Sequence, residues 1–167
     1  MAGSPWAGSD LHDAARNGWI EKVRRLLRSG ADVNWATDRG YTPITSASYM
    51  GHVEVVKLLL ETPGVEMNNA GKEGFTALHS AAKRGNVEVV RALLEVDGID
   101  VNTVNMFGFT PLNSAAREGN TEIVKLMLET PGVDVNQATS GRTALSLALE
   151  RGDTVMVDIL KAAGATR

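Results

Sequence analysis

The feature that most constrains this chain is a sequence period of about 34 residues. A Gly-aromatic-Thr triplet begins at Gly40, Gly74 and Gly108, and a fourth copy at Gly141 carries arginine in place of the aromatic residue. Two further markers, one asparagine and one glycine in each copy, keep nearly the same spacing: Asn34, Asn68, Asn102 and Asn136; Gly51, Gly85, Gly119 and Gly152. Three markers in register predict a repeat protein, built from stacked copies of one small unit.

Each repeat carries signals for two short helices. A threonine followed by proline or alanine, as in Thr110-Pro111, predicts the start of the first helix. The hydroxyl accepts a hydrogen bond from a first-turn amide, and proline is tolerated at the first helical position. The following glycine, here Gly119, predicts the end of that helix. A second helix follows with an apolar stripe, for example Val55-Val56 and Leu58-Leu59. One such pair cannot enclose a core alone, so the pairs are expected to stack as a solenoid.

The repeated segments resemble the ankyrin repeat. Thr-Pro-Leu-Asn-Ser-Ala-Ala at 110–116 and Thr-Ala-Leu-His-Ser-Ala-Ala at 76–82 are similar to its Thr-Pro-Leu-His-x-Ala-Ala signature, and Gly-Ala-Asp-Val-Asn at 30–34 is similar to its inter-repeat segment. The resemblance covers about 10–165. It implies an all-α ankyrin solenoid of five helix-turn-helix units joined by β-turn loops, with three full repeats between N- and C-terminal capping repeats.

The resemblance also sets the expected boundaries. The first helix pair should run from Asp10 to Ser29 and the last from Thr143 to Ala163, within an ankyrin domain at 10–167. Charged residues on the outer faces of these end units are typical of caps. Residues 1–9, with Ala-Gly-Ser-Pro near the start, are expected to form a flexible tail that resembles part of an expression tag.

Composition narrows the function. The chain has 17 Lys and Arg against 20 Asp and Glu, a formal net charge of −3, which argues against duplex DNA as a partner. It lacks cysteine, which excludes disulfides, thiolate zinc sites and a cysteine nucleophile. It contains no run of about 18 apolar residues, so we expect no membrane span. A natural chain of this kind would suit the cytoplasm. Absence of thiols equally suits an engineered ankyrin binder, although the repeats differ more at framework positions than a strict consensus design would.

The sequence does not predict an enzyme. His12, His52 and His79 are too far apart for a paired metal motif, and His79 occupies the family's capping histidine position. No phosphate-binding glycine motif occurs. We therefore expect no catalytic residue, metal or cofactor.

The resemblance implies that a partner would bind to the loop tips and the exposed parts of the first helices, on the concave side. The candidate partner-binding residues are the variable positions there: Trp35, Asp38, Arg39, Tyr41, Tyr49, Met50, Lys72, Phe75, Lys83, Arg84, Met106, Phe107, Phe109 and Arg117. All six aromatic residues outside the tail and the first unit belong to this set, and we expect them to face solvent. Tyr41, Phe75 and Phe109 have an alternative structural role, because natural ankyrins often carry a packing aromatic there.

These observations predict a monomeric module that binds another protein, with no nucleic acid and no membrane partner. Two alternatives remain at this point. The aromatic surface could mediate self-association. Aromatic residues beside Lys72, Lys83, Arg84 and Arg117 could instead hold a small molecule or nucleotide between repeats.

Overall fold

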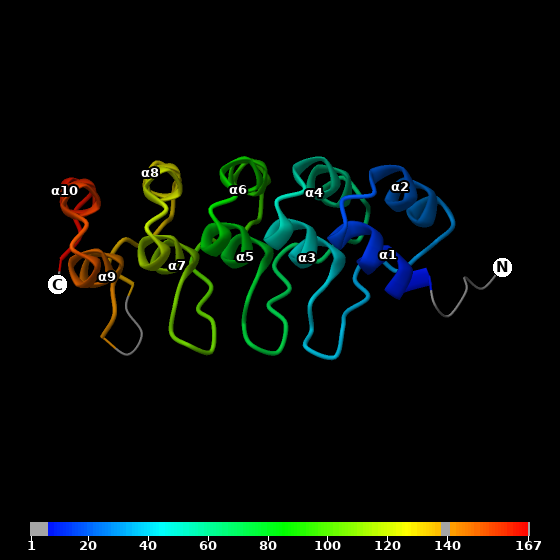
Figure 1. Cartoon of the computed structure of the whole chain (residues 1–167), viewed down its shortest axis with the longest axis horizontal. Helices are drawn as coiled ribbons and strands as arrows, with labels where there is room; N and C mark the ends of the chain where they lie inside the picture. Colours follow the sequence, from blue (N-terminus) through cyan, green and yellow to red (C-terminus); the bar gives the residue numbers. More distant parts are fainter. Residues whose placement is uncertain (1–6, 138–140, 167) are drawn as a thin grey trace.

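The structure is a computed structural model that describes residues 7–137 and 141–166. The described residues form ten helices, paired into five units that stack in a row (Figure 1). The first helices of the units are α1 (Ala7–Arg16), α3 (Pro43–Met50), α5 (Ala77–Arg84), α7 (Pro111–Glu118) and α9 (Ala144–Arg151). The second helices are α2 (Ile20–Arg28), α4 (Val53–Leu60), α6 (Val87–Leu94), α8 (Thr121–Leu128) and α10 (Thr154–Ala162).

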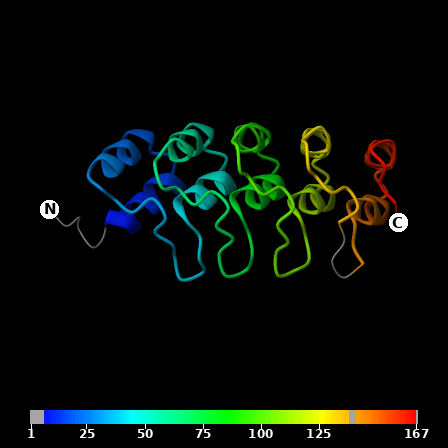
Figure 2. The same ribbon diagram turned by 180° about the vertical axis from the view of Figure 1, so that it is seen from behind.

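The helices lie in two rows. The first helices form one row, here called the inner row, and the second helices form the outer row; the two ends of the chain lie at opposite ends of the stack (Figures 1 and 2). Along the inner row α1 packs on α3, α3 on α5, α5 on α7 and α7 on α9, and the outer helices contact their neighbours in the same order. This confirms the predicted all-α solenoid of five helix pairs.

The predicted start and stop signals of the inner helices are confirmed. In α5 the Thr76 hydroxyl accepts a hydrogen bond from the backbone N–H of His79, and the threonines that precede α3, α7 and α9 do the same. Each of these helices ends at the glycine marker in a left-handed conformation, which glycine adopts without steric cost.

The core lies between the two rows and is made of aliphatic side chains and methionine, together with Phe109. Small residues such as Ala81 and Ala115 are fully buried on the inner helices, where they let neighbouring helices approach closely. Larger side chains such as Leu59, Leu93 and Met127 come from the outer helices. The core therefore continues from unit to unit, as expected for a solenoid.

The beginning of α1 differs from the expected boundary. The helix begins at Ala7, so residues 7–9 of the expected tail belong to a helix. Gly8 is buried there: a β-carbon on it would lie 2.5 Å from the side chain of Trp35, which packs on this turn. The rest of the expected tail, residues 1–6, lies outside the described residues. At the other end, Leu149 and Val155 are exposed beside the charged residues, so the last unit is a less polar cap than predicted.

The asparagine marker links consecutive units. The side-chain amide of Asn68 donates to the carbonyl of Gly98 (2.7 Å), and its oxygen accepts from the N–H of Asp100 (2.9 Å). Asn34, Asn102 and Asn136 make the same pair of bonds to the loop of the following unit. We call this two-bond contact the asparagine clip. It gives the 34-residue period a physical cause, because each clip fixes the next loop at a set distance.

The long loops that precede α3, α5 and α7 are here called the fingers. Tight turns at 37–40, 71–74 and 105–108 form their tips. Each finger is closed by a backbone hydrogen bond, from Gly40 to Thr37 in the first. Neighbouring fingers are also bonded together, because the N–H of Lys72 donates to Arg39 (3.1 Å) and that of Met106 donates to Glu73 (3.0 Å). The fingers are therefore held in one row beside the inner helices.

Candidate functional site

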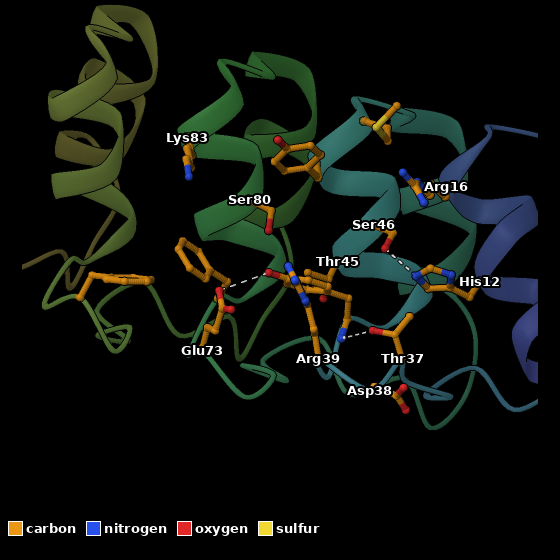
Figure 3. A pocket seen from close by; sticks show the side chains of 15 residues that line it. His12, Arg16, Thr37, Asp38, Arg39, Thr45, Ser46, Glu73, Ser80 and Lys83 are labelled. Carbon is orange, nitrogen blue, oxygen red and sulfur yellow. Dashed lines mark hydrogen bonds between the residues drawn. The ribbon is translucent and has the colours of Figure 1, made fainter.

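A groove of about 700 Å³ lies between the fingers and the inner helices of the first three units (Figure 3). Arg39, Tyr41 and Glu73 line it from the fingers, and Tyr49, Met50 and Lys83 line it from the ends of α3 and α5. Its remaining lining residues are His12, Arg16, Thr37, Asp38, Thr45, Ser46, Phe75, Ser80 and Phe107. The groove therefore uses both parts of the surface that the resemblance implied.

Large apolar side chains are exposed at this groove. Tyr49 is 41% exposed, Met50 48% and Phe107 56%, although side chains of this kind are usually buried in a soluble protein. Phe107 packs against Phe75, with ring centroids 5.9 Å apart. Met106, 67% exposed, lies on the same finger as Phe107. Several exposed apolar groups around one groove indicate an interaction surface.

Cations lie over aromatic rings along the same surface. The ammonium group of Lys83 lies 5.5 Å from the ring centroid of Phe75, and the guanidinium group of Arg84 lies 4.8 Å from that of Tyr49. Arg117 and Phe109 repeat the arrangement one unit further on, at 5.1 Å. Each contact orients a flexible side chain without neutralising its charge, because an aromatic ring carries no formal charge.

The polar end of the groove is formed by His12 and Ser46, whose Nε2 and Oγ atoms are 2.8 Å apart (Figure 3). Burial lowers the pKa of His12, and the nearby positive charge of Arg16 lowers it further, although the carboxylate of Asp13 raises it. The imidazole is therefore expected to be neutral at pH 7.

Tyr41 lies at the base of the first finger and donates its hydroxyl proton to Glu73 at 3.5 Å. Partial burial, together with the negative charge of Glu73, raises the pKa of this phenol above its usual value. Tyr41 is thus a neutral hydrogen-bonding and packing group, and the geometry gives it no acid–base role.

The structure brings together eight of the candidate residues at the groove: Asp38, Arg39, Tyr41, Tyr49, Met50, Phe75, Lys83 and Phe107. Arg84 adjoins them through its contact with Tyr49. Lys72 and Met106 occupy finger tips outside the groove lining, and the Phe109–Arg117 pair lies on the next unit.

The expectation that all six aromatic residues face solvent is wrong. Phe109 is buried, with 7% of its surface exposed, and its carbonyl accepts a hydrogen bond from His79. Tyr41 and Phe75 are half-buried, in keeping with the packing role considered for that position. Trp35 is also half-buried and packs against Gly8 and His12, with the His12 and Trp35 ring centroids 5.7 Å apart. Only Tyr49 and Phe107 of the six are exposed.

Several groove residues were not among the sequence candidates. His12 and Arg16 come from the first unit, where only a capping role was expected. The period contains the signal that could have found them: His12 lies 34 residues before Ser46 and 68 before Ser80, two residues that also line the groove. Arg16 stands in the same relation to Met50.

The predicted structural role of His79 is confirmed. Its Nδ1 atom lies 2.9 Å from the hydroxyl of Thr76 and accepts from the backbone N–H of that residue, which completes a capping box at the start of α5. Its Nε2 atom lies 2.9 Å from the carbonyl of Phe109 in the next unit. His79 thus joins two units inside the core.

Residues 7–137 and 141–166 contain neither a candidate metal site nor a membrane span. No group of three or more His, Cys, Asp or Glu residues in these ranges could hold a metal ion. No helix there is both long and apolar enough to cross a lipid bilayer.

Comparison with known proteins gives the family. A family model described as ankyrin repeats (3 copies) matches residues 11–105 and 97–166. Similar segments occur in human ankyrin repeat and SAM domain-containing protein 3 (45% identical over 53 residues, 31% of this chain and 8% of that protein) and in human espin-like protein (38% over 56 residues, 34% and 6%). Mouse protein phosphatase 1 regulatory subunit 12A is 35% identical over 54 residues, 32% of this chain and 5% of that protein.

These matched segments span less than a tenth of each of the three relatives, so the similarity concerns the repeat alone. The family model, by contrast, extends over almost the whole chain. Together with the stacked helix pairs, the threonine and glycine boundaries and the capping histidine, it shows that this chain belongs to the ankyrin-repeat family.

Proposed function

We propose that this chain is a non-enzymatic module that binds a partner protein through the groove between its fingers and inner helices. Ankyrin repeats are in general protein–protein interaction modules and typically have no catalytic activity. The observation that carries the proposal for this chain is the exposure of Tyr49, Met50 and Phe107 around one groove. Aromatic anchors in a concave site are the usual centres of binding energy in protein interfaces.

The geometry of the groove supports the same function. Hydrogen bonds between neighbouring fingers fix one wall, and α3 and α5 form the other. A surface that is already ordered loses little conformational entropy when a partner binds. The groove therefore suits recognition of a partner without a large rearrangement.

The test removes the exposed aromatic groups. A double variant, Tyr49→Ala with Phe107→Ala, should reduce capture of a partner from a cell extract at least about 30-fold, which corresponds to about 2 kcal/mol. Val155→Ala is the matched control, because Val155 is an equally exposed apolar residue on α10, outside the groove. Quantitative mass spectrometry of the captured proteins measures the difference. A loss of less than about 1 kcal/mol in the double variant would contradict this site. Trp35 is a poorer choice, because its removal would also disturb the packing of α1.

Self-association is a second candidate, supported by the same exposed apolar groups. It predicts a molar mass that rises with concentration in light scattering and returns to the monomer value in the double variant. A constant monomer mass would exclude it. A small-molecule or nucleotide ligand is a third candidate, supported by the cation–aromatic pairs, and it would raise the melting temperature when added.

A further inference from the structure

The cations of the groove have no carboxylate partners among the described residues. Arg16, Arg39 and Lys83 line the groove, and none of them forms an ion pair with another described residue. The Lys and Arg ion pairs that the described residues do form lie on α2 and α6, between neighbours in sequence. All three residues of the groove are exposed, so their charges are available to an anionic group of a ligand.

The cations continue along the ends of the inner helices. Lys83 and Arg84 lie in the last turn of α5 and Arg117 in the last turn of α7. A basic residue in this position also stabilises its own helix, because its charge opposes the helix dipole. That role needs no ligand, so binding measurements must separate the two effects. The aromatic contacts of these side chains nevertheless keep the cations at the rim of the groove.

The acidic residues of the groove lie elsewhere. Glu73 is on the second finger, where it accepts the hydroxyl proton of Tyr41, and Asp38 is at the tip of the first finger. In Figure 3 both carboxylates lie in the lower half of the view, whereas Lys83 and Arg16 lie in the upper half, on opposite sides. The finger edge of the groove thus carries both carboxylates together with Arg39, whereas the helix edge carries Arg16 and Lys83.

We propose that the groove binds an acidic peptide segment of its partner in an extended conformation. Carboxylate side chains of this segment contact Arg16 and Lys83, and a large apolar side chain packs between Tyr49, Phe75 and Phe107. The proposal rests on the proposed function and adds the chemistry of the partner. A basic segment would instead place like charges together at the helix edge.

The length of the segment follows from the spacing of the helices. The groove extends across α1, α3 and α5, and packed helices are about 8–10 Å apart, so it is roughly 20 Å long. An extended chain rises about 3.3 Å per residue, so about six residues span the groove. A segment of this length reaches from Arg16, which binds one carboxylate, to Lys83 and Phe75, where a second carboxylate and the apolar side chain bind side by side.

The first experiment selects peptides of about twelve random residues displayed on phage against the immobilised full chain, at about 50 mM NaCl where charge interactions are weakly screened. We expect the enriched peptides to be net negative and to contain at least one Phe, Leu, Trp or Met. Enriched peptides that are neutral or basic would overturn the proposal. So would a preference for single-stranded oligonucleotides, shown by displacement of an enriched peptide with a mixed-sequence oligonucleotide.

The second experiment measures the Kd of an enriched peptide by fluorescence polarisation. We expect Arg16→Gln and Lys83→Gln each to weaken binding about tenfold, and about 500 mM NaCl to weaken binding to the unchanged chain. Lys125→Gln is the matched control, because Lys125 is an exposed lysine in the last turn of α8, outside the groove. Thermal melting of each variant checks that the fold is intact. Equal affinities for all variants would overturn the proposal.

The two proposals fail in different ways. If the Tyr49→Ala, Phe107→Ala variant loses the captured partner but the glutamine variants retain it, the groove binds a protein whose segment is not recognised by charge. In that case the proposed function stands and the acidic segment is wrong. If the double aromatic variant still captures the partner, the groove itself is not the binding site.

Discussion

At the scale of the residue, His79 shows how one side chain couples two units and makes the fold sensitive to pH. It is fully buried, and its two ring nitrogens face Thr76 and the carbonyl of Phe109. A neutral ring that donates from Nε2 and accepts at Nδ1 satisfies both contacts. A second proton on the ring would make Nδ1 a donor, and this donor would face the backbone N–H of Thr76. Burial lowers the pKa of His79 to about 4, although the bond to the Phe109 carbonyl opposes this shift.

This shift predicts a loss of stability in mild acid. In the unfolded chain His79 binds a proton near pH 6.5, whereas in the folded chain it binds this proton only near pH 4. Stability is therefore complete above pH 6.5 and falls with decreasing pH through the window between these values, by about 2 kcal/mol from pH 7 to pH 5. Urea unfolding at pH 5, 6 and 7 measures the slope.

The control for this prediction is His79→Asn. The equivalent position of the next unit is Asn113, and its side-chain amide donates hydrogen bonds to the carbonyls of the following unit. We expect the variant to lose most of the pH dependence. A smaller slope should remain, since burial also lowers the pKa of His12. An unchanged slope in the variant would assign the effect to another group.

At the scale of the element, the fingers depend on glycines that tolerate both an unusual backbone and a close neighbour. Gly74 has a φ of +77°, and a β-carbon on it would lie 2.7 Å from the Cα atom of Asn105 in the next finger. Gly64 has a similar φ of +82°, but nothing lies within 4 Å of the position where a β-carbon would be. Alanine substitution at these two glycines therefore separates two free-energy costs. Gly64 reports the cost of the positive φ alone, and Gly74 reports that cost together with the clash against the next finger.

We therefore expect Gly74→Ala to lower the free energy of unfolding by about 2–4 kcal/mol and Gly64→Ala by only about 1 kcal/mol. Chemical denaturation of the two variants measures both values. The Gly74 variant should also weaken any ligand of the groove, because the second and third fingers must move apart. Equal destabilisation by the two substitutions would mean that the fingers are not in firm contact.

The elements themselves could largely be predicted from the sequence. Threonine and glycine act within one helix, so their effect is local, and they predicted both boundaries of α3. Exposure could not be predicted in the same way. Phe75 and Phe109 occupy the same position in their repeats, yet only Phe109 is buried. Burial depends on side chains of neighbouring units, and a single repeat does not contain that information.

The candidate site was predicted in part for the same reason. Tyr49, Lys83 and Phe107 lie together at the groove because they occupy finger and helix-end positions, but their role in binding stays a prediction. The sequence predicts that Trp35 faces solvent, but α1 begins earlier than expected and its Gly8 leaves space for the indole ring. The boundary of α1 carried no threonine–proline signal, so neither the extra turn nor its contact with Trp35 could be predicted.

At the scale of the whole molecule, the linear stack predicts a gradient of stability. Units in the middle pack against neighbours on both sides, whereas the first and last units pack on one side only. We expect amide hydrogen exchange to be slowest in α5 and α6 and fastest in α1, α2, α9 and α10. Exchange followed by mass spectrometry at pH 7 measures this order. Uniform protection of all five units would instead indicate that the molecule unfolds in one cooperative step.

The asparagine clips have a consequence for how such a chain can diversify. In the last unit the interval from Asn136 to Gly141 is one residue shorter than that from Asn102 to Gly108, yet Asn136 still bonds to Gly164 and Thr166. The two partners of Asn136 lie 28 and 30 residues further along the chain, against 30 and 32 for Asn102, so the same clip forms across a shorter repeat. The loop tips can therefore vary while the clips still hold neighbouring units together. Insertions or sequences transplanted into the tips should change which partner the molecule binds, while the stacked helix pairs keep their arrangement.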